Sequence, residues 1–157
     1  MNEYQNLIIQ KNEKICYVRL NRPHSLNALN SDLLIDIKNF SNSLTNDLET
    51  RVVIFTGNGK NFSSGADLKE KVEYSSKMDA WRKNVGKPTI KSILDIPQIT
   101  IAAVNGYCLG GAACIATACD FRIGASNSKV GYPEINLGIN LNWLGLPLAV
   151  RLIGPAK

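Results

Sequence analysis

Two junctions between an apolar run and glycines, followed by one carboxylate, are the features of this sequence best suited to chemistry. The apolar run 52–57 leads to residues 64–66, and the run 99–104 leads to residues 110–111. Small residues at such turns leave main-chain N–H groups accessible, and two N–H groups aimed at one point form an oxyanion hole. The sequence therefore predicts a site that stabilises negative charge on a carbonyl oxygen, with Glu134 as a nearby acid or base.

Other catalytic and metal-binding patterns are weaker. The chain has one histidine, His24, so a zinc site would need scattered thiols, and a serine or cysteine nucleophile would have a single candidate base. Ser63 and Ser64 lie outside any G-x-S-x-G motif, and residues 57–59 lack the rest of a phosphate-binding loop. We expect no metal site, and we expect reduced, buried thiols at Cys16, Cys108, Cys114 and Cys119.

The bulk composition is that of one globular domain spanning residues 1–157. Apolar residues make up 45% of the chain and charged residues 20%, which is enough to bury a core. The start of the chain lacks the build of a signal peptide, and no apolar run is long enough to cross a bilayer, so we expect a cytoplasmic protein without membrane contact. The net charge of +5 is spread along the chain, so we expect a solvated basic surface and no nucleic-acid partner.

The first third of the chain is predicted to form a hairpin, a helix and a strand. Residues 7–9 and 15–20 are β-prone runs around a polar turn. An amphipathic helix capped near Asn30 is indicated by apolar residues at three- and four-residue spacing, namely Leu33, Ile37, Phe40, Leu44 and Leu48. The run 52–57 predicts a strand covered on both faces, with a glycine-rich loop and a helix start after it.

The rest of the chain continues the alternation of strands and helices. Residues 70–95 predict one or two partly exposed helices interrupted near Gly86 and Pro88, and residues 99–104 predict a second buried strand. Residues 111–118 are apolar on every side, which indicates an enclosed helix. Two short strands at 121–125 and 129–132 and a final helix at 141–153 complete a predicted α/β fold.

Four blocks of the sequence carry a resemblance to a known family. Residues 62–69, 105–111, 119–122 and 132–134 resemble, in order and spacing, the signature blocks of the crotonase (enoyl-CoA hydratase/isomerase) family. The resemblance implies a crotonase-like spiral of ββα units that binds acyl-CoA thioesters. It also implies no permanently bound cofactor, coenzyme A being part of the substrate.

The resemblance assigns roles to the residues that the junctions singled out. The thioester oxygen is held by the N–H groups of Ala66 and Gly111, and Glu134 is the main acid/base. Gly111 also opens the apolar helix, whose N-terminal dipole favours negative charge. Substrate contacts fall on Ala66, Asp67, Leu68, Lys69, Gly110 and Gly111. Lys69, with Lys60 and Arg22 as weaker candidates, is expected to meet the coenzyme A phosphates.

The sequence departs from the family pattern at Cys114, where hydratases of the family carry a second glutamate. Hydration usually divides its proton transfers between two carboxylates, and a buried thiol is a poor substitute. One carboxylate can move a proton between two carbons, so isomerase-type chemistry is favoured. Hydration, with Asp67 or Asp120 as second acid, remains open, and so does a non-catalytic acyl-CoA binding or assembly module. A role in RNA binding would require salt-sensitive affinity.

The second departure is at Lys157, where the chain stops and family members continue into a helical portion. In the family that portion closes the acyl pocket and helps subunits pack into trimers or paired trimers. We therefore expect exposed apolar faces in this chain, and a homo-oligomer where that portion is present.

Overall fold

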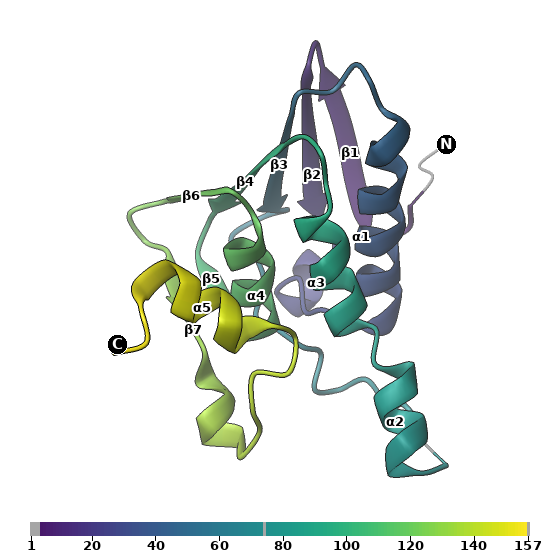
Figure 1. Cartoon of the computed structure of the whole chain (residues 1–157), viewed down its shortest axis with the longest axis vertical. Helices are drawn as coiled ribbons and strands as arrows, with labels where there is room; N and C mark the ends of the chain where they lie inside the picture. The colour runs from purple at the N-terminus through teal and green to yellow at the C-terminus, as the bar shows by residue number, and fades with distance from the viewer. Residues whose placement is uncertain (1–3, 74, 157) are drawn as a thin grey trace.

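A mostly parallel five-stranded sheet is the framework of the computed structural model, which describes residues 4–73 and 75–156 (Figure 1). In spatial order its strands are β1 (Leu7–Asn12), β2 (Ile15–Leu20), β3 (Val52–Gly57), β4 (Ile99–Val104) and β6 (Phe121–Gly124). β1 and β2 pair in antiparallel fashion, as the hairpin prediction requires, and the other neighbours are parallel. Parallel strands bring their carboxyl ends to one edge of the sheet, where ligands of open α/β folds bind.

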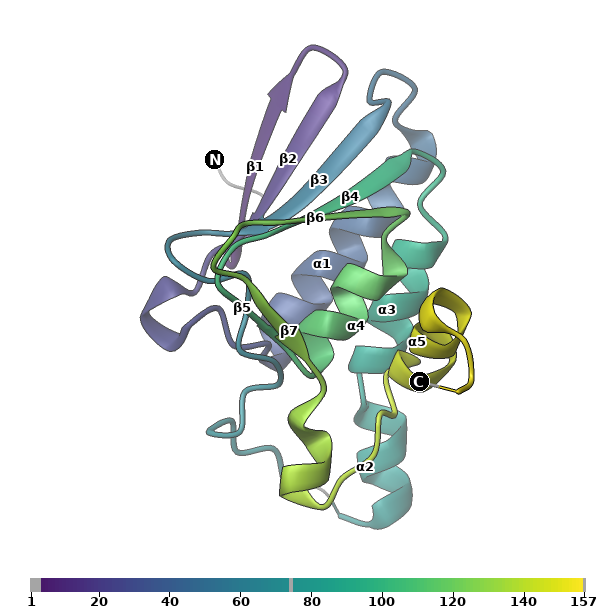
Figure 2. The same ribbon diagram turned by 90° about the vertical axis from the view of Figure 1, so that its left-hand side faces the viewer.

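Three helices pack on one face of this sheet (Figure 2). They are α1 (Ser31–Ser43), α3 (Gly86–Leu94) and α4 (Gly111–Ala118). On β3, Val53 and Phe55 face them and are fully buried, whereas the residues between are half-buried. The prediction that this strand is covered on both faces is therefore wrong, and its alternation is that of a sheet with one fully packed face.

The helix α1 follows the predicted pattern but ends early. Its N-cap Asn30 accepts a hydrogen bond from the Leu33 N–H at 3.1 Å. A short 3-10 helix, η2 (Leu44–Asn46), follows, and Leu48 is 77% exposed instead of lying on the apolar stripe. The helix stops because Asp47 forms a turn, in which its side chain accepts from the N–H groups of Glu49 and Thr50.

The region 70–95 holds two helices, α2 (Lys77–Lys83) and α3. The break lies at residues 84–85, and Pro88 sits inside the first turn of α3, where a missing N–H is tolerated. The helix start expected after Gly65 is not formed. Residues 64–73 make turns and an isolated bridge, because Asp67 accepts from the Lys69 N–H and pairs with Arg22.

A second, two-stranded parallel sheet extends from the carboxyl ends of β4 and β6. It consists of β5 (Tyr107–Leu109) and β7 (Lys129–Gly131), and β7 leads into the 3-10 helix η3 (Pro133–Leu137). The last helix, α5 (Gly145–Ile153), starts four residues later than the predicted 141–153. A loop, 138–144, precedes it. Gly138, with φ +65°, ends η3, and Leu144, with φ +61°, is the residue before α5, so the helix cannot extend back through it.

Apolar side chains gather on the surface of the last third of the chain. We call this set the C-terminal apolar surface, and its most exposed members are Phe121, Ile123, Val130, Ile135, Leu137, Ile139, Leu146 and Ile153, each more than half exposed. β6, β7 and η3 bury none of their hydrophobic side chains, in contrast to α4, which is buried along nearly its whole length. Among the described helices, none is long and apolar enough to span a bilayer.

Candidate active site

The loop at Ser63–Ala66 and the turn that starts α4 are held in register by the main chain. The Ser63 N–H donates to the Tyr107 carbonyl at 2.9 Å, and the Leu109 N–H donates to the Ser63 carbonyl at 3.2 Å. Gly65 has φ +95°, and a Cβ there would lie 2.6 Å from the Leu109 carbonyl oxygen and 3.7 Å from the nitrogen of Gly111. Only glycine fits, and its absent side chain lets the two predicted junctions meet.

The bridge between Leu29 and Ala66 decides where the Ala66 N–H points. Leu29 donates to the Gly65 carbonyl at 2.8 Å and accepts from the Asp67 N–H at 3.1 Å. In this parallel pairing Leu29 bonds only to the neighbours of Ala66, so the N–H of Ala66 itself is directed away from Leu29. Within residues 4–73 and 75–156, the Ala66 N–H donates to no protein acceptor.

Gly111 supplies the second free N–H group. It is the first residue of α4, and the first four N–H groups of a helix have no acceptor inside it. No protein acceptor for the Gly111 N–H occurs in the described ranges. The neighbouring Gly110 N–H, by contrast, is used by the Gly131 carbonyl at 2.9 Å, which fixes the turn to β7.

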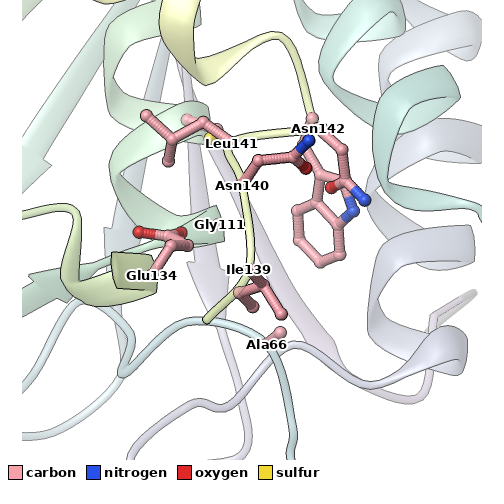
Figure 3. Close-up of a pocket in the computed structure, with 9 residues that line it drawn as sticks. Ala66, Gly111, Glu134, Ile139, Asn140, Leu141 and Asn142 are labelled. Carbon is pink, nitrogen blue, oxygen red and sulfur yellow. The ribbon is translucent and has the colours of Figure 1, made fainter. Parts of the chain in front are cut away.

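One cavity of about 170 Å³ collects the three residues predicted to do the chemistry (Figure 3). Its lining consists of Ala66, Gly111, Cys114, Glu134, Ile139, Asn140, Leu141, Asn142 and Trp143. Figure 3 shows the Glu134 side chain, which comes from η3, lying near Gly111, with Ala66 farther from it beside Ile139. The residues that carry the two unused N–H donors and the carboxylate therefore line one cavity.

Glu134 is held with part of its carboxylate unpaired. Its Oε2 is buried and has no hydrogen-bond partner among the described residues. Its Oε1 lies so close to Gly110, which has φ +54°, that a Cβ there would be 2.7 Å away. A buried carboxylate oxygen without a donor costs free energy, so Oε2 does not stabilise the fold through a hydrogen bond to the described residues. Gly110, predicted to touch substrate, is thus in contact with the acid.

Cys114 lies in the same cavity, but its thiol is not a base. Burial, reinforced by the negative charge of Glu134, raises the pKa of Cys114 to about 12. The thiol is therefore neutral at physiological pH. Gly145, the first residue of α5, packs closely on its Sγ, where a Cβ would lie 2.8 Å away.

The two aspartates considered as second acids lie elsewhere. Asp120 accepts from the N–H and the hydroxyl of Thr100, both at 2.8 Å, and lines a different cavity with Arg122. Asp67 pairs with Arg22 at 2.9 Å, and the hydrogen bond from that guanidinium lowers the pKa of Asp67. Both carboxylates are structural in this arrangement, and neither lines the cavity of Glu134.

The predicted coenzyme A contacts do not line the cavity. Leu68 and Lys69 are exposed beside Ala66, and neither lines the cavity. Lys60 is exposed as well. The Arg22 guanidinium donates to the Asp67 carboxylate and to the Ala28 carbonyl. It is therefore not free to bind a coenzyme A phosphate.

Sequence reasoning missed the segment 139–143, which supplies five of the lining residues. The predicted helix 141–153 includes part of this segment, and apolar residues of a predicted helix are expected in the core. The signal lay in Asn140 and Asn142, since asparagine favours turns over helix interiors. Trp143 in particular lies against Gly111, where a Cβ would overlap its ring.

The thiols behave as predicted. Cys16, Cys108, Cys114 and Cys119 are all free and buried. Across residues 4–73 and 75–156, no group of three or more histidine, cysteine, aspartate or glutamate side chains could hold a metal ion.

Sequence comparison identifies relatives along nearly the whole chain. The profile of the family described as Enoyl-CoA hydratase/isomerase matches residues 10–157. The chain is 39% identical to the crotonyl-CoA hydratase of Syntrophomonas wolfei and 39% identical to the short-chain-enoyl-CoA hydratase of Clostridium acetobutylicum. Each match covers 97% of this chain and 59% of the relative, so the chain spans about three fifths of the length of these proteins.

Structural comparison gives the same family and confirms the predicted fold. The crystal structure of the enoyl-CoA hydratase from Bacillus anthracis superposes with a TM-score of 0.89 at 34% identity, over 96% of this chain and 59% of that one. The α/β architecture is therefore a crotonase-like spiral of ββα units. On the matched profile and the shared fold, the chain belongs to the enoyl-CoA hydratase/isomerase family.

Proposed function

We propose that the protein acts on an enoyl-CoA thioester through an enolate, and that it moves a double bond by transferring one proton between two carbons. The observation that carries this proposal is the unpaired buried Oε2 of Glu134 in a cavity that Ala66 and Gly111 also line. A carboxylate and two N–H donors around one space suit a reaction that builds charge on a carbonyl oxygen.

The proposed reaction runs in two steps. Glu134 removes a proton from the carbon beside the thioester carbonyl of a 3-enoyl-CoA, and the electron pair moves onto the thioester oxygen. The N–H groups of Ala66 and Gly111 stabilise this oxyanion, and the N-terminal dipole of α4 adds to their effect. Glu134 then returns the proton to the γ carbon, which gives the 2-enoyl-CoA and restores the carboxylate.

Cys114 supports isomerisation over hydration. Adding water requires one group to hold and activate it while another protonates the neighbouring carbon, and a thiol with a pKa of about 12 does not deprotonate water. A single carboxylate, in contrast, suffices for moving a proton within one substrate. The proposal therefore assigns all proton transfer to Glu134.

Hydration is the second candidate, because the relatives in Syntrophomonas wolfei and Clostridium acetobutylicum are named as hydratases. A non-catalytic acyl-CoA binding module is the third, and the absence of a second acid in the cavity favours it. In each case the substrate or ligand is an acyl-CoA. The exposed residues Leu68 and Lys69 stand beside Ala66, where we propose that they contact the coenzyme A portion, with the Lys69 ammonium near a phosphate.

We further propose that copies of the chain associate. The C-terminal apolar surface exposes eight large apolar side chains by more than half, and exposed apolar side chains in such number are typical of surfaces that bind another protein. Sedimentation velocity over a range of concentrations tests this, with association expected and a monomer at every concentration contradicting it.

Two parallel assays test the proposed reaction. Purified protein is given 3-butenoyl-CoA to follow isomerisation and 2-butenoyl-CoA to follow hydration. We expect isomerisation to exceed hydration, and we expect Glu134→Gln to lower kcat for isomerisation by about 10²–10⁴-fold, the usual contribution of an acid/base group.

Glu49→Gln is the matched control, since it makes the same chemical change at an exposed glutamate outside the cavity. Calorimetry with the unreactive butanoyl-CoA, run on both variants, separates loss of catalysis from loss of binding. Hydration faster than isomerisation would replace the first candidate by the second. Binding without turnover, unchanged by Glu134→Gln, would support the binding module.

A further inference from the structure

Trp143 forms a wedge between the starts of two helices. Gly86 is the first residue of α3 and Gly111 the first residue of α4, and a Cβ at either position would overlap the indole ring. The pyrrole side of the ring lies on Gly86, and its benzo side lies on Gly111. Both glycines are therefore required for the indole to sit where it does.

Two cavities lie near the ring. Trp143 lines the 170 Å³ cavity together with Ala66, Gly111 and Glu134. A second cavity of about 340 Å³ is lined by Trp81, Arg82, Asn84, Lys87, Pro88 and Asn142. Asn142, next to Trp143 in the chain, lines both cavities, and Gly86, on which the indole lies, stands between Asn84 and Lys87 in the sequence. The indole therefore lies among residues that border both spaces.

We propose that Trp143 is the specificity-determining residue for acyl-chain length, and that it restricts the site to short acyl chains; this inference rests on the proposed function. The thioester oxygen, bound at the Ala66 and Gly111 N–H groups, places the acyl chain next to Gly111. A ring packed directly on Gly111 meets that chain after few carbons. The cavity is also smaller than the 300–1,000 Å³ usual for sites that hold larger ligands.

The backbone next to Trp143 holds the ring in place. Leu144 has φ +61°, a left-handed conformation that is unfavourable for a bulky side chain, and it forms the N-cap of α5. Strain of this kind persists where the surroundings over-determine the geometry. Behind it, the Leu148 N–H donates to the Leu144 carbonyl at 3.2 Å, which ties the position of the ring to a helix.

The test measures a ratio of rates. kcat/KM is determined for a series of 3-enoyl-CoA substrates from four to ten carbons, or for the 2-enoyl series if hydration is the reaction found. We expect the unaltered protein to prefer the four-carbon substrate to the ten-carbon one. We expect Trp143→Ala to raise the ten-to-four ratio by at least about 10-fold, because each methylene that gains an apolar site is worth roughly 10-fold or more.

Two further variants make the result interpretable. Trp81→Ala removes the other tryptophan, which is 75% exposed in the second cavity, and should leave the chain-length ratio near its original value. Trp143→Phe keeps an aromatic ring and should give an intermediate ratio, which provides a test if Trp143→Ala fails to fold. A ratio taken on one preparation does not depend on the fraction of folded protein.

The inference is overturned by equal turnover of four- and ten-carbon substrates in the unaltered protein, or by unchanged ratios in folded Trp143 variants. If no substrate is turned over, the same question is answered by binding. The Trp81→Ala variant has Trp143 as its one tryptophan, whose fluorescence should respond to butanoyl-CoA. Calorimetry with decanoyl-CoA then compares the unaltered protein with Trp143→Phe, and tighter binding to the variant would support the inference even though the proposed catalysis fails. An affinity for decanoyl-CoA that is the same in both proteins would contradict the inference, whether or not the proposed reaction is found.

Discussion

The two walls of the cavity are built in different ways. The main-chain wall, at Ala66 and Gly111, is tied into the core by the bridges at Leu29 and Ser63 and by a buried helix. The acid wall, residues 133–144, is bonded mainly to itself, as where the Ile139 N–H donates to the Glu134 carbonyl. Most of its side chains are exposed, Ile135 by 86%.

The positions of the two N–H donors are therefore determined by the fold, whereas the position of the acid is determined by a local segment. The N–H donors are consequences of how strands and α4 meet, so they cannot move without cost to the core. The acid reaches the same space on a segment with few long-range bonds. Changes to the main-chain wall should therefore lower stability and activity together, whereas changes to the acid wall should lower activity with less effect on stability.

Matched glycine substitutions are the strongest test of this contrast. Gly65→Ala places a Cβ 2.6 Å from a backbone oxygen at φ +95°, so we expect a loss of about 3–4 kcal/mol in the free energy of unfolding. Displacing the Ala66 N–H should also lower kcat/KM by about 10²-fold or more. Gly138→Ala, at φ +65° with nothing within 4 Å, should cost only about 1–2 kcal/mol.

Denaturant unfolding and steady-state kinetics on both variants give the comparison. Equal destabilisation by the two substitutions would contradict the account of the two walls. So would full activity in a folded Gly65→Ala protein, because it would mean that the Ala66 N–H is not used.

The next test changes one side chain in the cavity and leaves the main-chain wall unaltered. Cys114→Glu supplies a second carboxylate to the cavity that Glu134 also lines, and we expect the ratio of hydration to isomerisation to rise by about 10-fold or more. Cys114→Ser, which adds no acid, should leave that ratio unchanged. A ratio that stays constant in folded Cys114→Glu would show that the missing carboxylate does not decide the reaction.

The main-chain wall could be predicted from the sequence, whereas most of the acid wall could not. The junctions at Ala66 and Gly111 were predictable because apolar runs ending in glycine fix both a strand and an accessible turn. The early end of α1 and the loop 138–144 were not, because apolar residues such as Leu48 and Leu141 match a helical pattern whether or not they are buried. Trp143 depends on contacts with Gly86 and Gly111, which are distant in sequence, so no local pattern announces its position.

The smallest effect is expected at the ion pair behind the main-chain wall. The Arg22 guanidinium holds the pKa of Asp67 below its ordinary value, so the pair stabilises the fold above that ordinary value and is lost as pH falls through the lowered one. At neutral pH we expect Asp67→Asn to cost about 1 kcal/mol or less and to reduce activity a few-fold. The stability difference from the unaltered protein should shrink below about pH 4, as measured by unfolding across pH. A difference that grows on acidification would contradict this role.

The most direct test is a crystal structure of the protein with bound butanoyl-CoA, a saturated thioester that cannot react. The account predicts the thioester oxygen at about 3 Å from the nitrogens of both Ala66 and Gly111, with the Glu134 carboxylate facing the adjacent carbon. A thioester oxygen bound by neither N–H group, or an acyl chain lying outside the cavity of Glu134, would contradict it.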